Sequence, residues 1–96
     1  MRVTQIKPQD IADYGRIPSV DESTLNELEI YRKAAIEYVK SYTGLKLMEL
    51  NSHEDISIAV LALAVDMYDN RSMYVDKSNL NKVVSSILDM YSVNLL

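Results

Sequence analysis

The sequence contains no cysteine, and it has only two glycines and two prolines. The absence of cysteine excludes a disulfide scaffold, a zinc site built on thiolates and a cysteine nucleophile. A sheet-rich chain needs many tight turns, which so few glycines and prolines cannot supply. These absences favour a helical protein.

Long hydrophobic runs are also missing. The longest uninterrupted apolar run is Ile58–Val65, whereas a bilayer span takes about 20 apolar residues. The N-terminus lacks the apolar stretch of a signal peptide, so we expect a soluble chain with no membrane partner. Ten basic residues against fourteen acidic ones give a net charge of −4, which argues against binding nucleic acid through a basic face.

The composition is that of one small globular domain. The chain has 96 residues, of which 48% are hydrophobic and 25% are charged. A domain of this size buries about two-thirds of the surface that its unfolded chain exposes. We therefore expect a single helical domain over residues 1–96, with flexible ends at 1–7 and 92–96.

The clearest amphipathic pattern predicts a helix from about Asp21 to Thr43. Asp21 is a good N-cap, and Gly44 stands where a left-handed C-terminal residue belongs. The apolar stripe predicts Leu28, Ala35 and Val39 in the core. Ile30 and Ala34 fall outside that stripe, so they are either scattered surface residues or part of a contact with another chain.

A second long helix is expected from about His53 to Arg71. Ser52 and Asp55 have the spacing of a capping box. Residues 56–65 are apolar almost all round, which indicates a helix that is buried on most sides. We expect this helix to lie at the centre of the fold, with Val60 and Leu63 in the core.

Two further helices complete the prediction. A short one runs from Pro8 to Tyr14 and is closed by Gly15. The last one, capped by Asp76 or Ser78, ends near Tyr91. Its apolar stripe contains the core candidates Val84, Ile87 and Leu88, together with Leu80, Val83 and Tyr91. The connection over 45–51 is either extended or a loose helical turn.

The predicted fold class is therefore all-α. It is a small bundle of three main helices around a central apolar helix, with a short N-terminal helix.

Residues with catalytic or metal-binding chemistry are few. The only histidine is His53, and no motif spacing ties a serine or a carboxylate to it. Asp66, Asp69 and Asp76 do not have the spacing of an EF-hand, and there is no glycine-rich phosphate loop. We expect no enzyme activity, no metal and no cofactor.

All seven aromatic residues are tyrosines, a residue type that is enriched at protein interfaces. Tyr31, Tyr42 and Tyr91 lie on the core stripes, and we expect them to edge the core with their hydroxyls in water. Tyr38 and Tyr74 are better candidates for an interface.

Three stretches together resemble the small head–tail connector proteins of tailed bacteriophages, which are also called head-completion or portal-adaptor proteins. They are 34–39 leading into 42–44, the Tyr-x-Asn-Arg sequence at 68–71, and 86–91. The resemblance covers about residues 9–91. It departs from the family where a Leu-Arg-Ile-Asp stretch often stands, here Gly15-Arg16-Ile17-Pro18, and in the short connection at 45–51.

The resemblance implies a structural subunit that forms a homo-oligomeric ring under the portal protein, extends the DNA channel and supports a stopper or tail-completion protein. DNA would pass through without sequence recognition. The chain would reside at the head–tail junction of the virion, and in the host cytoplasm during assembly. The alternative is a small helical regulator that binds DNA or a partner protein.

The candidate residues for assembly combine these two lines of reasoning. Asn70 and Arg71 either cap the helix, with a salt bridge from Arg71 to Asp66 or Asp69, or anchor the loop that follows. The full set of candidate interface residues is Ile30, Ala34, Tyr38, Asn70, Arg71 and Tyr74.

Overall fold

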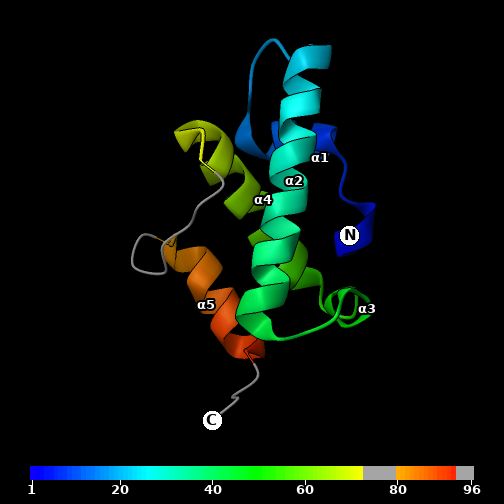
Figure 1. Cartoon of the computed structure of the whole chain (residues 1–96), viewed down its shortest axis with the longest axis vertical. Coiled ribbons are helices and arrows are strands. Elements are labelled where there is room, and N and C mark those ends of the chain that lie inside the picture. The colour runs from blue at the N-terminus through cyan, green and yellow to red at the C-terminus, as the bar shows by residue number, and fades with distance from the viewer. Residues whose placement is uncertain (73–79, 93–96) are drawn as a thin grey trace.

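In the computed structural model, which describes residues 1–72 and 80–92, every regular element is a helix (Figure 1). The all-α prediction is thus confirmed. The elements are the 3-10 helix η1 (Val3–Gln5) and the helices α1 (Pro8–Gly15), α2 (Glu22–Thr43), α3 (Leu47–Leu50), α4 (Glu54–Asn70) and α5 (Lys82–Tyr91). Tyr74, both predicted caps of the last helix and residues 93–96 lie outside the described residues.

Helix α2 begins and ends where the sequence predicts. The Asp21 carboxylate accepts a hydrogen bond of 2.8 Å from the backbone N–H of Thr24, which satisfies one of the free donors of the first turn. At the other end Gly44 has φ 75° and donates to the carbonyl of Lys40. Glycine adopts the left-handed conformation at little energetic cost, so the helix ends at this position.

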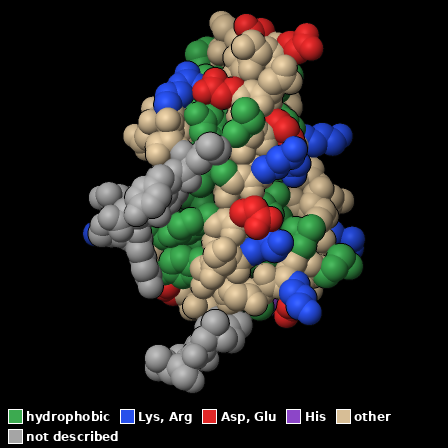
Figure 2. All heavy atoms as spheres, viewed as in Figure 1, with side chains coloured by type: hydrophobic (Ala, Val, Ile, Leu, Met, Phe, Trp, Pro, Cys, Tyr) green, Lys and Arg blue, Asp and Glu red, His purple; other side chains and the backbone are tan. Residues whose placement is uncertain are grey.

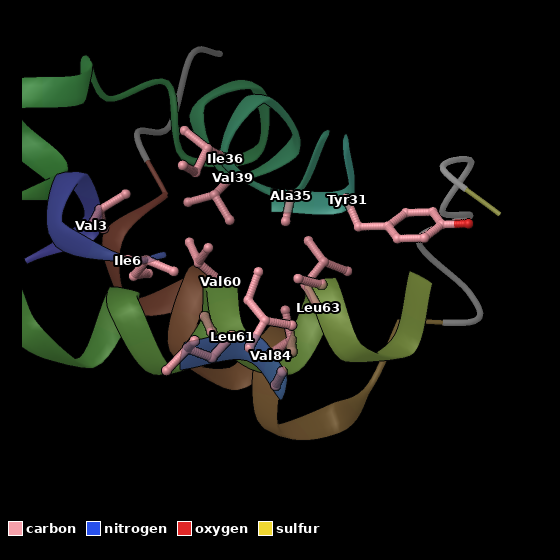
Figure 3. Close-up of a cluster of buried hydrophobic side chains, with 14 of the residues drawn as sticks. Val3, Ile6, Tyr31, Ala35, Ile36, Val39, Val60, Leu61, Leu63 and Val84 are labelled. Atoms are coloured by element: carbon pink, nitrogen blue, oxygen red, sulfur yellow. The ribbon is translucent and has the colours of Figure 1, made fainter. Parts of the chain in front are cut away.

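Helix α4 is the element on which the others pack. It crosses behind α2 in Figure 1 and contacts α1, α2 and α5. Figure 3 shows Val60 and Leu63 pointing from α4 toward Val39 and Ala35 of α2. Burial of each large aliphatic side chain stabilises the fold by about 1.5–3 kcal/mol. Of the eight predicted core residues, seven are fully buried, and Ile87 is partly buried against the same cluster.

The end of α1 differs from the prediction. Gly15 is the last helical residue, and Arg16 takes the left-handed conformation with φ 52°. A Cβ atom at Gly15 would lie 2.9 Å from Cγ2 of Val65. Position 15 therefore needs glycine for the close approach of α1 to α4, and the helix ends one residue later.

The N-terminal segment belongs to the core. Within the stretch 1–7, which the sequence predicts to be flexible, Val3 and Ile6 are 0% and 3% exposed. Both reach into the cluster in Figure 3. Thr4 donates its backbone N–H to Oδ1 of Asn51 at 3.1 Å. The connection over 45–51, left open by the sequence, holds the single turn α3 and so gives η1 a surface to pack on.

The predicted caps of α4 and α5 are wrong. Helix α4 begins at Glu54 after His53, and no side chain caps it. The Asp55 carboxylate, assigned to a capping box with Ser52, accepts instead from the hydroxyl of Tyr91. Helix α5 is capped by Asn81, whose side chain accepts from the N–H of Val83 at 2.8 Å. Val83 is 56% exposed and lies outside the core, whereas its neighbour Val84 is buried.

Replacement of Arg16 by glycine is expected to stabilise the fold. The left-handed conformation costs a residue with a Cβ about 1–2 kcal/mol, and the flexibility of glycine in the unfolded chain offsets part of that gain. We expect Arg16→Gly to raise the free energy of unfolding by up to about 1 kcal/mol in urea titrations. Arg16→Ala keeps the Cβ and should show no gain; equal stability of both variants would contradict the explanation.

Candidate assembly surfaces

The C-terminal end of α4 is closed by a hydrogen-bonded turn built on the Tyr-x-Asn-Arg sequence. Arg71 has φ 50° and donates its N–H to the carbonyl of Tyr68 at 3.2 Å. Ser72 donates to the carbonyl of Met67 at 3.1 Å. This pair of bonds satisfies two otherwise free carbonyls of the last turn. The Asn70 side chain donates to the carbonyl of Asp66 at 2.8 Å.

The Arg71 side chain then ties this turn to α2. Its guanidinium lies 4.1 Å from the centre of the Tyr68 ring and forms an ion pair with Glu27. The hydroxyl of Tyr31 donates to the same carboxylate at 3.3 Å, and the Tyr31 and Tyr68 rings meet edge to face with centres 6.3 Å apart. We call Glu27, Tyr31, Tyr68 and Arg71 the Arg71 anchor. It fixes the point at which the chain leaves α4.

The predicted salt-bridge partners of Arg71 were therefore wrong. Asp66 and Asp69 are close to Arg71 in sequence, but Glu27 of α2 is the residue that it contacts. Local spacing does not reveal that α2 runs beside the end of α4. The hydrogen bond to Glu27 raises the pKa of the Arg71 guanidinium above its ordinary value.

A second set of tyrosine contacts holds α5 in place. The Tyr42 hydroxyl donates to the Asp89 carboxylate, and the Tyr91 hydroxyl lies 2.8 Å from both carboxylate oxygens of Asp55. The His53 ring packs on the Tyr91 ring with centres 4.2 Å apart. Tyr42 and Tyr91 are partly buried at the edge of the core, and each hydroxyl also has a carboxylate partner on a neighbouring helix, which the sequence did not predict.

These bonds change the acidity of the two phenols. The hydrogen bond to Asp89 is the main cause that raises the pKa of Tyr42 to about 12, with burial and the charge of Asp89 adding to it. The hydrogen bond to Asp55 likewise raises the pKa of Tyr91 above its ordinary value. Both phenols therefore stay protonated, as donors, well into the alkaline range.

The remaining candidate residues lie along α2. Ile30 is 53% exposed and stands one turn after Glu27 of the Arg71 anchor. Ala34 follows one turn later and is partly buried against the core, as is Tyr38. The Tyr38 ring is 6.0 Å from the Tyr42 ring, centre to centre. Of these residues, Ile30 presents the large exposed apolar side chain.

Sequence reasoning did not identify a groove on the other flank of α2. The groove has a volume of about 430 Å³, and its lining residues come from η1, α2 and α3. They are Thr4, Arg32, Lys33, Ile36, Glu37 and Leu47. Met48, next to Leu47 in α3, is 77% exposed. Figure 2 shows Lys and Arg side chains gathered over this right-hand part of the face, with apolar side chains among them. We call the lining residues and Met48 the α3 groove.

Neither a metal centre nor a membrane span is found in the described part of the chain. Residues 1–72 and 80–92 contain no group of three or more His, Asp or Glu residues able to hold a metal ion. Over the same residues, no helix combines the length and the apolar character that crossing a bilayer requires.

Residues 19–95 match the family model described as phage gp6-like head-tail connector protein. The match includes α2, α3, α4 and α5, whereas η1 and α1 precede it. No curated protein and no solved structure matches the chain.

The Tyr42–Asp89 bond makes a testable contribution at high pH. The folded pKa of Tyr42 exceeds the ordinary value of 10.0, so the folded state retains the proton longer than the unfolded state. The stabilisation is complete below pH 10 and is lost as the pH rises through about 12. In urea unfolding, Tyr42→Phe should be less stable than the wild type at neutral pH, and this difference should shrink in the alkaline range.

Tyr14→Phe is the matched control, because Tyr14 is 47% exposed on α1. It should follow the wild type closely in both pH ranges. If the difference in free energy of unfolding between Tyr42→Phe and the wild type stayed constant with pH, the stabilisation would not come from the Tyr42–Asp89 hydrogen bond.

Proposed function

Since the chain belongs to the phage gp6-like head–tail connector family, we propose that it forms a ring beneath the portal protein, extends the DNA channel and carries the stopper or tail-completion protein. The family match over residues 19–95 is the observation that carries this proposal. A structural role in joining head and tail follows from the family itself, and the ring, the portal and the stopper are the finer steps proposed here.

A ring requires two different patches on each subunit, because the contact between neighbours is head to tail. The outer face of α2 supports one of them, with Ile30 exposed and Ala34 one turn later. Tyr38 is proposed as a further contact on this helix. Head-to-tail contacts form a closed ring when the rotation between neighbours brings the last copy back to the first.

The Arg71 anchor supports a role in positioning the segment that follows it. Arg71 and Asn70 fix the direction of the chain at the end of α4 through bonds to α2 and to the last turn. We propose that this segment, including Tyr74, contacts the portal or the next subunit. Tyr74 is proposed from the sequence alone.

The charge of the chain fits a DNA conduit. With a net charge of −4, the subunit repels phosphates, and a duplex would not adhere to the channel wall. DNA would then pass without being read. A salt-dependent shift of duplex DNA by the free protein would instead favour the alternative, a small helical regulator.

Removal of the chain from a phage that encodes it should block completion of the virion. We expect DNA-filled heads and separate tails in electron micrographs, because nothing joins the portal to the tail. Supplying the chain in trans should restore joined particles, and the restored virions should contain it. Normal virions without the chain would contradict the proposed role.

Arg71→Ala separates folding from assembly. The Arg71 side chain is largely exposed, so its loss should cost little stability, and circular dichroism should show a folded helical protein. Complementation with this variant should give fewer joined particles than complementation with the wild type. Arg71→Lys, which keeps the charge but not the planar guanidinium, should be intermediate. Full complementation by Arg71→Ala would show that the Arg71 anchor has no role in assembly.

A further inference from the structure

The first fifteen residues form a segment that is anchored on the rest of the domain. Four of its apolar side chains are at most 3% exposed: Val3, Ile6, Ile11 and Ala12. Helix α1 packs on α2 and α4, and η1 packs on α3 and α4. We call residues 1–15 the arm, and residues 22–72 and 80–92 the body. The buried side chains of the arm depend on the body for their cover.

Thr4 adds a polar contact between the arm and the body. Its backbone N–H and its hydroxyl both donate to Oδ1 of Asn51, at 3.1 and 3.3 Å. Asn51 is the residue that ends α3. Because the body provides these partners, the body of another copy offers the arm an identical site.

An exposed link, residues 16–21, joins the arm to the body, and Figure 1 shows it as an arch from α1 to the start of α2. Ile17 and Val20 are partly buried against the core, and the other four residues are exposed. Arg16 and Ser19 take the left-handed conformation, with φ 52° and 53°. Neither residue is glycine, so the link is strained at two positions.

Exchange of the arm between copies relieves this strain. A link that passes to a neighbour can extend, and Arg16 and Ser19 then leave the left-handed region. Fully extended, six residues reach about 20 Å. The contacts of the arm are kept, because the body of the neighbour has the same residues. Strained links favour exchange of the element that they hold in place.

The arm and the site that accepts it are two different surfaces of one subunit. The family match begins at residue 19, within the link, so it includes the accepting body and leaves the arm outside. A copy that gives its arm to the next one has its own site free for the arm of the copy behind. Contacts of this head-to-tail kind close into a ring.

We propose that neighbouring copies of this chain exchange their arms, so that Val3, Ile6 and Ile11 of each copy are buried in the body of the next. The inference rests on the proposed ring and names a contact that joins its subunits. A single copy keeps its arm on its own body, and the exchange occurs where many copies fold together at high concentration.

Crosslinking between the arm and the body distinguishes the two arrangements. The side chains of Thr4 and Asn51 are in contact, and the sequence has no cysteine of its own. The variant Thr4→Cys/Asn51→Cys therefore has one thiol on the arm and one at its site. It is unfolded in urea, refolded at micromolar or millimolar concentration, and treated with a short thiol-specific crosslinker.

Denaturing gels should show single chains after refolding at micromolar concentration. After refolding at millimolar concentration they should show a ladder of linked chains that extends beyond the dimer. Single chains at both concentrations would overturn the exchange. Linked pairs and nothing larger would show a reciprocal dimer and would overturn the proposed order around a ring.

A mixture of the two single variants shows whose arm is bound. Thr4→Cys and Asn51→Cys, one of them tagged and refolded together at millimolar concentration, should give crosslinked pairs with one chain of each kind. Each single variant alone is the matched control and should remain as single chains, because two arm thiols do not meet. A mixture without mixed pairs would contradict the exchange.

Glycine in the link tests the role of strain. In the chain with both cysteines, Arg16→Gly/Ser19→Gly takes the left-handed conformation at little cost, so the arm should stay on its own body and the ladder should fall several-fold. Arg16→Ala/Ser19→Ala keeps both Cβ atoms and should give the full ladder. Equal ladders from the two variants would contradict exchange driven by the strained link.

The same crosslinking in virions separates this inference from the connector role. Joined particles that contain Thr4→Cys/Asn51→Cys should give the ladder after crosslinking. If joined particles contain this variant and yield only single chains, the arms are not exchanged and the connector role stands.

Discussion

Burial of α4 is the constraint on which the rest of the structure depends. Nine of its seventeen residues are buried, including Val60 and Leu63, which meet α2 in Figure 3. A helix with so little polar surface cannot be covered by one neighbour. Helix α4 is covered by the inner faces of α1, α2 and α5, together with Val3 and Ile6 of the N-terminal segment. The small size of the chain makes each of these contacts necessary.

The polar contacts of the fold are arranged around that core. Tyrosine suits the core edge because its ring packs on apolar side chains while its hydroxyl reaches a polar partner. Tyr31, Tyr42 and Tyr91 each donate to a carboxylate, on Glu27, Asp89 and Asp55. The first of these joins the Arg71 anchor at the end of α4, and the other two hold α5. Each end of α4 is thereby tied to a neighbouring helix.

Local signals in the sequence were sufficient for the four longer helices and for most of the core. Asp21 and Gly44 mark the ends of α2 because capping depends on the few residues around them. The predictions failed where a residue far away in the sequence determines the role of a side chain. Asp55 accepts a hydrogen bond from Tyr91 and does not cap the first turn of α4. Gly15 is required because α1 approaches Val65 closely there, and it does not end the helix. The α3 groove was missed because η1, α2 and α3 meet only in the folded chain.

Amide hydrogen exchange, measured residue by residue on the free and the assembled protein, tests this account most directly. Residues 56–65 should exchange slowest in both states, since they open only when the whole domain unfolds. Incorporation into the virion should leave the slow exchange of residues 56–65 unchanged. Fast exchange over 56–65 in the free protein would contradict a domain built on the burial of α4.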